Sequence, residues 1–218
     1  MTKTERTTRN RNPTAAERWA LPATQARSRA TRKRLLEAAE IVFAGKGYDG
    51  ARMSDIANEA GCSVGAVYFR FKDKNALFSA IAESFIADAR SGLAVLLDRP
   101  PGDTEQILRN FVVTSAANFR KHRGLFRAVV ERGIDQPEAM RTIFSFRDEL
   151  AAALENALGG TRNRPPGLAI RVMTQMVYGF LLTGVLNRHA PTRIDDARAI
   201  AELADACIVY LRYAKDAT

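Results

Sequence analysis

The chain has 218 residues, of which 46% are apolar, so it can bury a hydrophobic core without disulfides or structural metals. Its formal net charge of +9 attracts polyanions, so nucleic acid is the first candidate partner and an anionic membrane the second. The two cysteines, Cys62 and Cys207, lie far apart without metal-ligand spacing, which excludes a disulfide framework and suits the reducing cytoplasm.

The first residues carry much of this positive charge. Ten Lys or Arg residues precede Leu35, and only Glu5 and Glu17 oppose them. Pro13 and Pro22 interrupt the segment, which has few large apolar groups. We predict a flexible basic arm over residues 1–28. The alternative is a tail that only keeps the chain soluble.

Apolar residues at spacings of three and four predict helices, and no segment predicts a strand. The first helix is expected to begin near residue 28 and to end at Gly45 and Gly47. It buries a stripe formed by Leu35, Leu36, Ala39, Val42 and Phe43. The helices that follow it are predicted over 53–60, over 64–71 and from residue 74 onward.

The break Pro100-Pro101-Gly102 separates two all-helical domains, which we place at 29–89 and 90–218. Further helices are predicted from Asp103, over 125–131, from Pro137, over 168–187, and from Thr192 with Asp195 at its capping-box position. The most apolar stretch, 172–186, contains polar residues. It therefore predicts a buried helix rather than a membrane span, and we expect no membrane partner.

The stretch 52–71 has the parts of a helix-turn-helix. Gly61 allows a left-handed turn after the first helix, and Ser63 is a good N-cap for the second. Val67 and Phe71 lie four residues apart and can anchor the second helix to a core. This pattern is typical of proteins that place the second helix in the major groove of DNA.

The outer side of the second helix is slim. It begins with Val64, Gly65 and Ala66, whose small side chains let the backbone approach base edges. Tyr68 can donate its hydroxyl to a phosphate, and Arg70 adds positive charge. Since so few of these side chains read bases by hydrogen bonding, we expect DNA shape to contribute to specificity.

Lys74 gives an independent indication of DNA binding. Asp73 is the expected N-cap of the long helix, so Lys74 lies in the first turn, where a cation opposes the helix dipole. A DNA phosphate bound there would make the lysine favourable. The alternative is a solvated lysine without a role.

The segment from about Arg29 to Ala89 resembles the N-terminal domain of the TetR family, through FAGKGYDG and MSDIANEAGCSVGAVYFRFKDKNALF. The resemblance implies a three-helix DNA-binding domain joined by a fourth helix to an all-α effector-binding and dimerisation domain. It places Ser63, Gly65 and Ala66 at the groove, and Tyr68 and Lys74 on phosphates.

The chain departs from the family pattern at Arg52, where the family usually has Thr. Arginine cannot cap a helix, and a lost cap costs about 1 kcal/mol. Our hypothesis is that Arg52 contacts a phosphate instead; the alternative is a helix start shifted to use Ser54. Basic residues of the first helix are further candidates for phosphate or minor-groove contacts, or are merely solvated: Arg29, Arg32 and Lys33.

The resemblance also implies a homodimer and a small-molecule effector, apolar or amphipathic. The candidate dimer residues are Gly179, Gly184, Ile200, Leu203, Cys207 and Leu211, unless these only close the monomer core. The candidate effector residues are Phe111, Phe119, His122, Phe144, Met173, Met176, Tyr178 and Phe180, unless these too are core.

We therefore predict a sequence-specific regulator of transcription that binds double-stranded DNA in the cytoplasm, on the nucleoid. It is expected to be a repressor that an effector releases from a palindromic operator. One alternative is a nonspecific DNA binder driven by the basic arm. A helical enzyme is the other, but no metal, cofactor or nucleophile–base motif is present in the sequence, so no catalytic residue and no cofactor is expected.

Overall fold

The computed structural model describes residues 15–98, 104–132, 137–158, 167–187 and 192–214, with side chains described from residue 25 and, in the 137–158 segment, from residue 141. No strand occurs among these residues, so the predicted all-α class is confirmed. The helices are α1 (Ala15–Gly50), α2 (Met53–Glu59), α3 (Val64–Tyr68), α4 (Lys74–Leu97), α5 (Thr104–Lys121), α6 (Arg123–Arg132), α7 (Pro137–Leu158), α8 (Gly167–Leu186) and α9 (Ala197–Tyr213).

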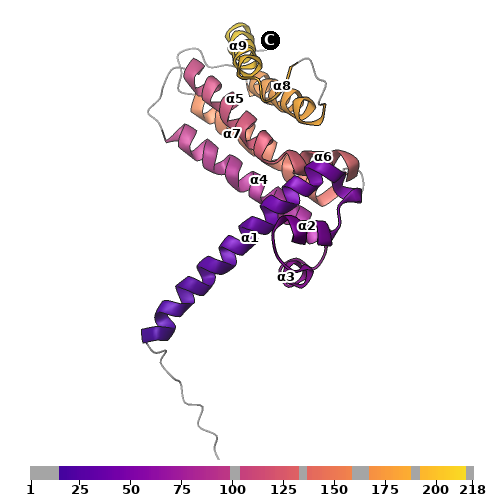
Figure 1. Ribbon diagram of the computed structural model, residues 1–218. Coiled ribbons are helices and arrows are strands. Elements are labelled where there is room, and N and C mark those ends of the chain that lie inside the picture. The colour runs from indigo at the N-terminus through magenta and orange to yellow at the C-terminus, as the bar shows by residue number, and fades with distance from the viewer. Residues whose placement is uncertain (1–14, 99–103, 133–136, 159–166, 188–191, 215–218) are drawn as a thin grey trace, which may run out of the picture.

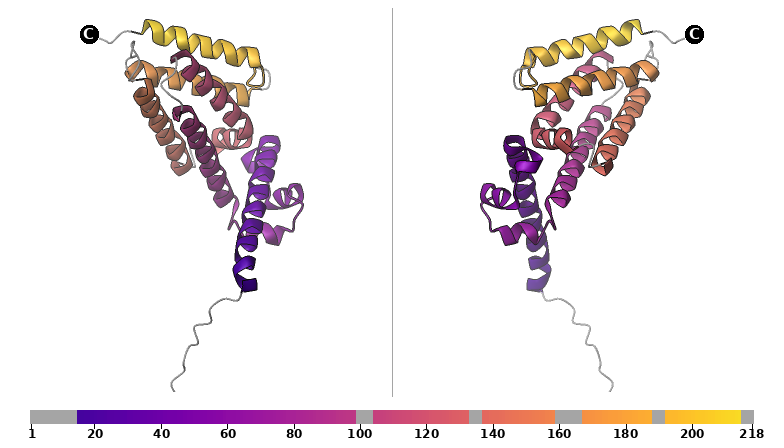
Figure 2. Two further views of the ribbon diagram at one scale, coloured as in Figure 1. Left: turned by 90° about the vertical axis from the view of Figure 1, so that its left-hand side faces the viewer. Right: turned by 90° about the vertical axis from the view of Figure 1, so that its right-hand side faces the viewer.

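The helices form two parts, a head and a bundle (Figure 1). The head consists of α1, α2 and α3, and α4 leads from it into the bundle formed with α5 to α9. The pair α8 and α9 lies at the end of the bundle farthest from the head (Figure 2).

Helix α1 begins at Ala15, earlier than the sequence predicted. The expected flexible arm over 1–28 is therefore helical from Ala15 onward, and its first 14 residues lie outside the described part. Alanine and arginine favour helix, and α1 continues through Pro22, although a proline inside a helix removes one backbone hydrogen bond. The predicted stripe Leu35, Leu36, Ala39, Val42 and Phe43 is buried, as expected.

Gly47 breaks the helical conformation of α1 near its end. Its φ of 72° lies in the left-handed region, which glycine tolerates best. A Cβ at Gly47 would lie 2.3 Å from the carboxylate of Glu131 on α6. Gly45, by contrast, stays helical, so only one of the two predicted helix-ending glycines acts as such.

Helix α9 begins at Ala197 rather than at the predicted Thr192. Asp196 is its N-cap and accepts a hydrogen bond of 2.9 Å from the Arg198 amide. Ile194 is buried, and its carbonyl accepts a bond of 3.0 Å from Arg120 on α5. These contacts with the bundle hold the preceding residues outside the helix.

Helix α8 is long and apolar enough to cross a membrane by length and composition alone. It packs instead against α5, α6, α7 and α9. Met173, Val177 and Leu181 are fully buried on its inner side, so the expectation of a buried helix holds for that face.

Candidate nucleic-acid interface

The helix-turn-helix forms as the sequence predicts. Gly61 has a φ of 62°, and the amide of Cys62 bonds the carbonyl of Ala57 over 2.9 Å. The hydroxyl of Ser63 accepts a bond of 3.2 Å from the Ala66 amide, so Ser63 is the N-cap of α3. Below α3, Val67 is fully buried, as the anchoring role requires.

Helix α3 ends at Tyr68, earlier than the predicted 64–71, because Phe69 and Arg70 form its C-terminal turn. Phe71 is nevertheless 5% exposed and anchors the segment. The turn aims Phe69 outward, where 85% of it is exposed. Sequence reasoning missed Phe69, although a large apolar residue between Tyr68 and Arg70 has no place in the buried pattern.

Helix α3 lies at the edge of the head, away from the bundle (Figure 1), and its outer face is open to solvent. Ser63, Val64, Gly65 and Tyr68 are exposed, and Ala66 is half-buried. A Cβ at Gly65 would meet only the Ser63 hydroxyl oxygen, at 3.9 Å. Nothing in the chain itself therefore requires glycine at position 65.

Helix α2 begins with Arg52 as its N-cap residue, so the alternative of a start shifted to Ser54 is wrong. The Asp55 carboxylate accepts from the Arg52 amide over 3.0 Å and lies 2.8 Å from the Lys46 ammonium. These hydrogen bonds, first that of Lys46 and then that of Arg52, lower the pKa of Asp55. The side chain of Arg52 stays exposed.

Lys74 is not solvated in this structure. Its ammonium donates to the carbonyls of Tyr48 over 2.6 Å, Ala51 over 3.0 Å and Asp49 over 3.5 Å. Partial burial lowers the pKa of Lys74. The lysine therefore ties the start of α4 to the end of α1, and its predicted phosphate contact stays a prediction.

The basic candidates on α1 are exposed but engage neighbours. Arg32 lies 5.9 Å from the ring centre of Phe71 and 3.8 Å from Glu83. Lys33 pairs with Glu37 over 3.7 Å. Together with Arg29 they line the side of a groove between α1 and α4 rather than the outer face of α3.

The predicted effector residues do not form one site. Phe111, Phe119 and Tyr178 line a small cavity between α4, α5, α7 and α8, together with Asn118. The volume of this cavity is about 30 Å³. The other candidates lie elsewhere: Phe144 and Met176 are exposed, Met173 is core, Phe180 is half-buried outside the cavity, and His122 bridges the head and the bundle.

The predicted dimer stripe is wrong for α9. Four of its members are buried in the monomer core, because α9 packs this apolar face on α5 and α8: Ile200, Leu203, Cys207 and Leu211. Gly184 faces Ile194, whose amide nitrogen would lie 3.3 Å from an added Cβ. Only Gly179 is exposed, with open space around it.

Two family descriptions match this chain. "Bacterial regulatory proteins, tetR family" matches residues 35–81, and "Tetracyclin repressor-like, C-terminal domain" matches residues 103–211. The first match lies over the head and the start of α4, and the second covers most of the bundle.

Curated relatives match part of the chain. It is 33% identical over 92 residues to the HTH-type transcriptional regulator AcrR of Shigella flexneri, over 41% of this chain and 42% of that protein. It is 44% identical over 54 residues to the uncharacterized HTH-type transcriptional regulator YvdT of Bacillus subtilis, and this match covers 25% of this chain and 28% of that protein. The chain thus spans less than half the length of these curated relatives.

Solved structures share the fold over most of the chain. The TetR family regulator PfmR of Thermus thermophilus matches with a TM-score of 0.62 and 24% identity, over 82% of this chain and 97% of that one. A transcriptional regulator from Rhodococcus sp. Rha1 matches with a TM-score of 0.68 and 20% identity, over 83% and 95%. With the helix-turn-helix and the family matches over both head and bundle, the chain belongs to the TetR family of bacterial regulatory proteins.

Proposed function

We propose that this protein is a repressor that docks α3 of each protomer into the major groove of a two-fold related operator, in the cytoplasm on nucleoid DNA. A small effector bound in the bundle releases it. DNA-binding regulation is the activity of the family to which the chain belongs.

The observation that carries the proposal is the outer face of α3. It is exposed and slim at Gly65, while the other side of the helix is anchored by fully buried Val67. A helix that served only the fold would gain stability from a larger residue at position 65, because glycine inside a helix costs about 1 kcal/mol relative to alanine. Close approach of α3 to the backbone and base edges of DNA would explain why position 65 is a glycine.

The test is substitution of Gly65 by leucine. Because a Cβ there meets only the Ser63 hydroxyl at 3.9 Å, Gly65→Leu should fold with an unchanged or higher melting temperature. It should nevertheless lose operator binding in a fluorescence-anisotropy titration. The matched control is Gly45→Leu, a helical position on α1 where a Cβ meets nothing within 4 Å. Operator binding by Gly65→Leu equal to that of Gly45→Leu would refute the docking.

For the homodimer we propose the outer faces of α8 and α9 in place of the buried stripe. Large apolar side chains are exposed there on both helices: Leu168, Val172, Met176 and Leu186 on α8, and Val209 and Tyr213 on α9. An exposed apolar patch of this kind marks an interaction site in soluble proteins. A second copy would bury it and place two heads on one DNA duplex.

For the effector we propose the cavity lined by Phe111, Phe119 and Tyr178. As it stands it has room for only one or two water molecules, whereas small-molecule sites measure about 300–1,000 Å³. Effector binding must therefore push α4, α5, α7 and α8 apart. The buried carbonyl oxygen of the Asn118 side chain has no hydrogen-bond partner, and none of the lining residues is charged. These features favour an uncharged effector with an N–H or O–H group.

A further inference from the structure

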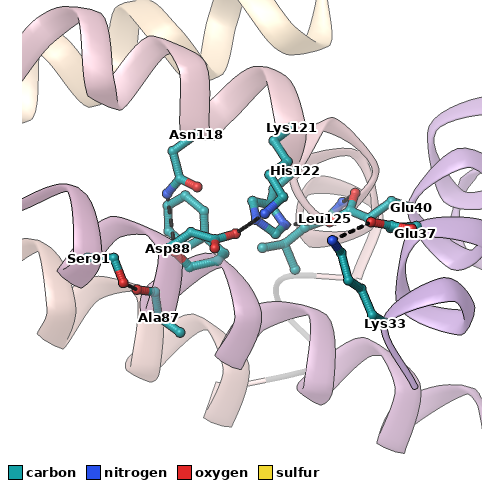
Figure 3. A network of polar contacts seen from close by, with 11 residues as sticks. Lys33, Glu37, Glu40, Ala87, Asp88, Ser91, Asn118, Lys121, His122 and Leu125 are labelled. Carbon is teal, nitrogen blue, oxygen red and sulfur yellow. Dashed lines mark hydrogen bonds and ion pairs between the residues drawn. The ribbon is translucent and has the colours of Figure 1, made fainter. Parts of the chain in front are cut away.

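His122 connects the head to the bundle through both nitrogens of its ring. Its side chain is 3% exposed and lies between α5 and α6. Nδ1 is 2.8 Å from Oε1 of Glu40 on α1, and Nε2 is 2.8 Å from Oδ2 of Asp88 on α4. Figure 3 shows the ring between these carboxylates, which come from two helices that are remote in sequence.

This geometry suits the protonated ring. An imidazolium carries a hydrogen on each nitrogen and can donate to both carboxylates, whereas a neutral imidazole has one N–H only. Loss of the proton would leave a ring nitrogen lone pair facing a carboxylate oxygen inside the protein. One of the two hydrogen bonds must then break.

The charged groups around the ring balance only when His122 is protonated. From α4, Asp88 also bonds the Lys121 ammonium of α5 at 2.5 Å. Burial alone would raise the pKa of Asp88, but the hydrogen bonds from Lys121 and His122 outweigh it and lower that pKa. Glu40 and Asp88 thus face one lysine and one histidine. When His122 is neutral, a negative charge remains uncompensated.

Other charged side chains near the ring have partners of their own. On the α1 and α4 side these pairs are Lys33 with Glu37 and Arg32 with Glu83, and Arg29 lines the same groove. On the α5 and α6 side, Arg120 bonds the Ile194 carbonyl and Arg123 pairs with Asp195. Arg29 and Glu40 line the same groove.

Glu40 is also held directly by α6. Its second carboxylate oxygen accepts from the Leu125 amide over 3.0 Å. A Cβ on Gly124 would lie 2.1 Å from the Glu40 carbonyl, so the two helices touch through their backbones here. A change at His122 therefore acts where α1 and α6 pack closely against each other.

A second attachment holds the end of α1 and does not involve a histidine. Arg127 donates to the carbonyls of Ala44 over 2.7 Å and Gly45 over 3.0 Å. Glu131 accepts from the Tyr48 amide over 2.6 Å. Breaking the bridge at Glu40 would leave this attachment in place, so the head would pivot about the α6 contact rather than detach.

We propose that Glu40, His122 and Asp88 form a proton-sensing joint that fixes the head against the bundle while His122 is protonated and lets it pivot when the proton is lost. Histidine is the side chain that ordinarily changes charge between about pH 5 and 8. A pivoting head must be ordered again on DNA, which lowers affinity. Operator affinity therefore falls as the pH rises. This last step rests on the proposed function, whereas the joint itself does not.

The experiment uses the full chain and measures amide hydrogen exchange by mass spectrometry between about pH 6 and pH 8.5, corrected for the intrinsic pH dependence of exchange. In the wild type, exchange in the α1 and α6 segments around Glu40 and Leu125 should rise about tenfold at the higher pH. Nitrogen NMR of the imidazole should show both ring nitrogens protonated at the lower pH and one at the higher.

Two variants should remove the pH dependence of the contact in different ways. His122→Gln has no titrating ring, and in Asp88→Asn the side-chain amide can donate to the ring nitrogen once it has lost its proton, so the contact survives deprotonation. In both, exchange around Glu40 should be independent of pH; Asp88→Asn keeps the test valid if His122→Gln does not fold. The matched control is His189→Gln, which removes the chain's other histidine and should behave as the wild type.

The operator titration is run over the same pH range. The wild type should bind about tenfold more weakly at the higher pH, and His122→Gln should show no such change. A ring whose protonation does not change over this range, or exchange that stays flat while the ring loses its proton, would overturn the joint. If exchange responds to pH but the wild type binds its operator equally well at every pH, the joint stands and its proposed effect on operator affinity is wrong. If exchange responds to pH but no operator is bound at any pH, the joint stands and the proposed function fails.

Discussion

The ammonium group of Lys74 donates a hydrogen bond of 2.6 Å to the backbone carbonyl of Tyr48, 26 residues earlier in the chain. A lysine in the first turn of α4 is unfavourable toward the dipole of that helix, but here it faces the carbonyls that end α1. The same ammonium lies 4.4 Å from the Tyr48 ring centre. Lys74 therefore fixes α4 to the end of the helix that carries most of the head core.

Replacing Lys74 by methionine should destabilise the free protein. The Tyr48 and Ala51 carbonyls would lose a charged donor, and such hydrogen bonds contribute about 1.5–3 kcal/mol. Urea unfolding of the variant should show a free energy lower by about that amount. Lys72→Met, at an exposed position two residues earlier, should be close to neutral. Equal stability of the two variants would mean that Lys74 serves only the DNA.

Phe69 should contribute to operator affinity. It is 85% exposed beside Tyr68, at the end of α3, where a groove surface could cover it. Burial of a phenylalanine side chain is worth about 1.5–3 kcal/mol, so Phe69→Ala should weaken binding about tenfold or more. An apolar ring can contact thymine methyl groups. Binding to an operator with uracil in place of thymine should therefore reduce the difference between the wild type and the variant.

The control for Phe69 is Val113→Ala, an exposed apolar position on α5 that is 52% exposed. It should leave operator affinity unchanged. If Phe69→Ala binds as tightly as Val113→Ala, the aromatic ring does not face the DNA.

The protein should lose stability in acid. The folded-state pKa of Asp88 is lowered, as is that of Glu149, chiefly through its hydrogen bond from Arg90. Groups with a lowered folded-state pKa stabilise the fold above their unfolded values of about 3.9–4.3, and this stabilisation is lost as the pH falls through the folded-state pKa. The urea midpoint should therefore fall between about pH 5 and pH 3.

Asp88→Asn should reduce this loss of stability in acid, because the asparagine side chain takes up no proton. Asp98→Asn, at the exposed end of α4, is the matched substitution and should keep the full loss. A urea midpoint that stays level in acid for the wild type would contradict the lowered pKa values.

Val209→Glu should convert the protein into monomers. Val209 is 51% exposed on the outer face of α9, and a carboxylate buried there without a partner would oppose association. Light scattering should give half the wild-type mass. Val130→Glu, at a 57% exposed site on α6, should keep the wild-type mass. A dimeric Val209→Glu would place the interface elsewhere.

Local signals made the helix-turn-helix predictable. Gly61, Ser63, Val67 and Phe71 each act on neighbours within a few residues, through turn conformation, capping and helix periodicity. The structure confirms all four. The true start of α9 escaped prediction because it depends on burial of Ile194 and on its bond from Arg120, 74 residues away.

The remaining wrong predictions concern residues whose contacts come from distant parts of the chain. The apolar stripe on α9 is equally compatible with a core and with an interface until the position of α5 is known. The sequence predicts His122 as a polar group among the candidate effector residues, whereas its carboxylate partners come from α1 and α4. Periodicity indicates which face of a helix is apolar, but it does not indicate what covers that face.

The central claim is that α3 reads a specific site in duplex DNA. The most direct measurement is a DNase footprint of the protein on the DNA flanking its own coding region, at physiological salt and with excess competitor DNA. We predict protection of one short inverted repeat with two half-sites about one helical turn apart. Protection without sequence preference, weakening with salt equally on every DNA, would contradict the claim and leave a nonspecific DNA binder.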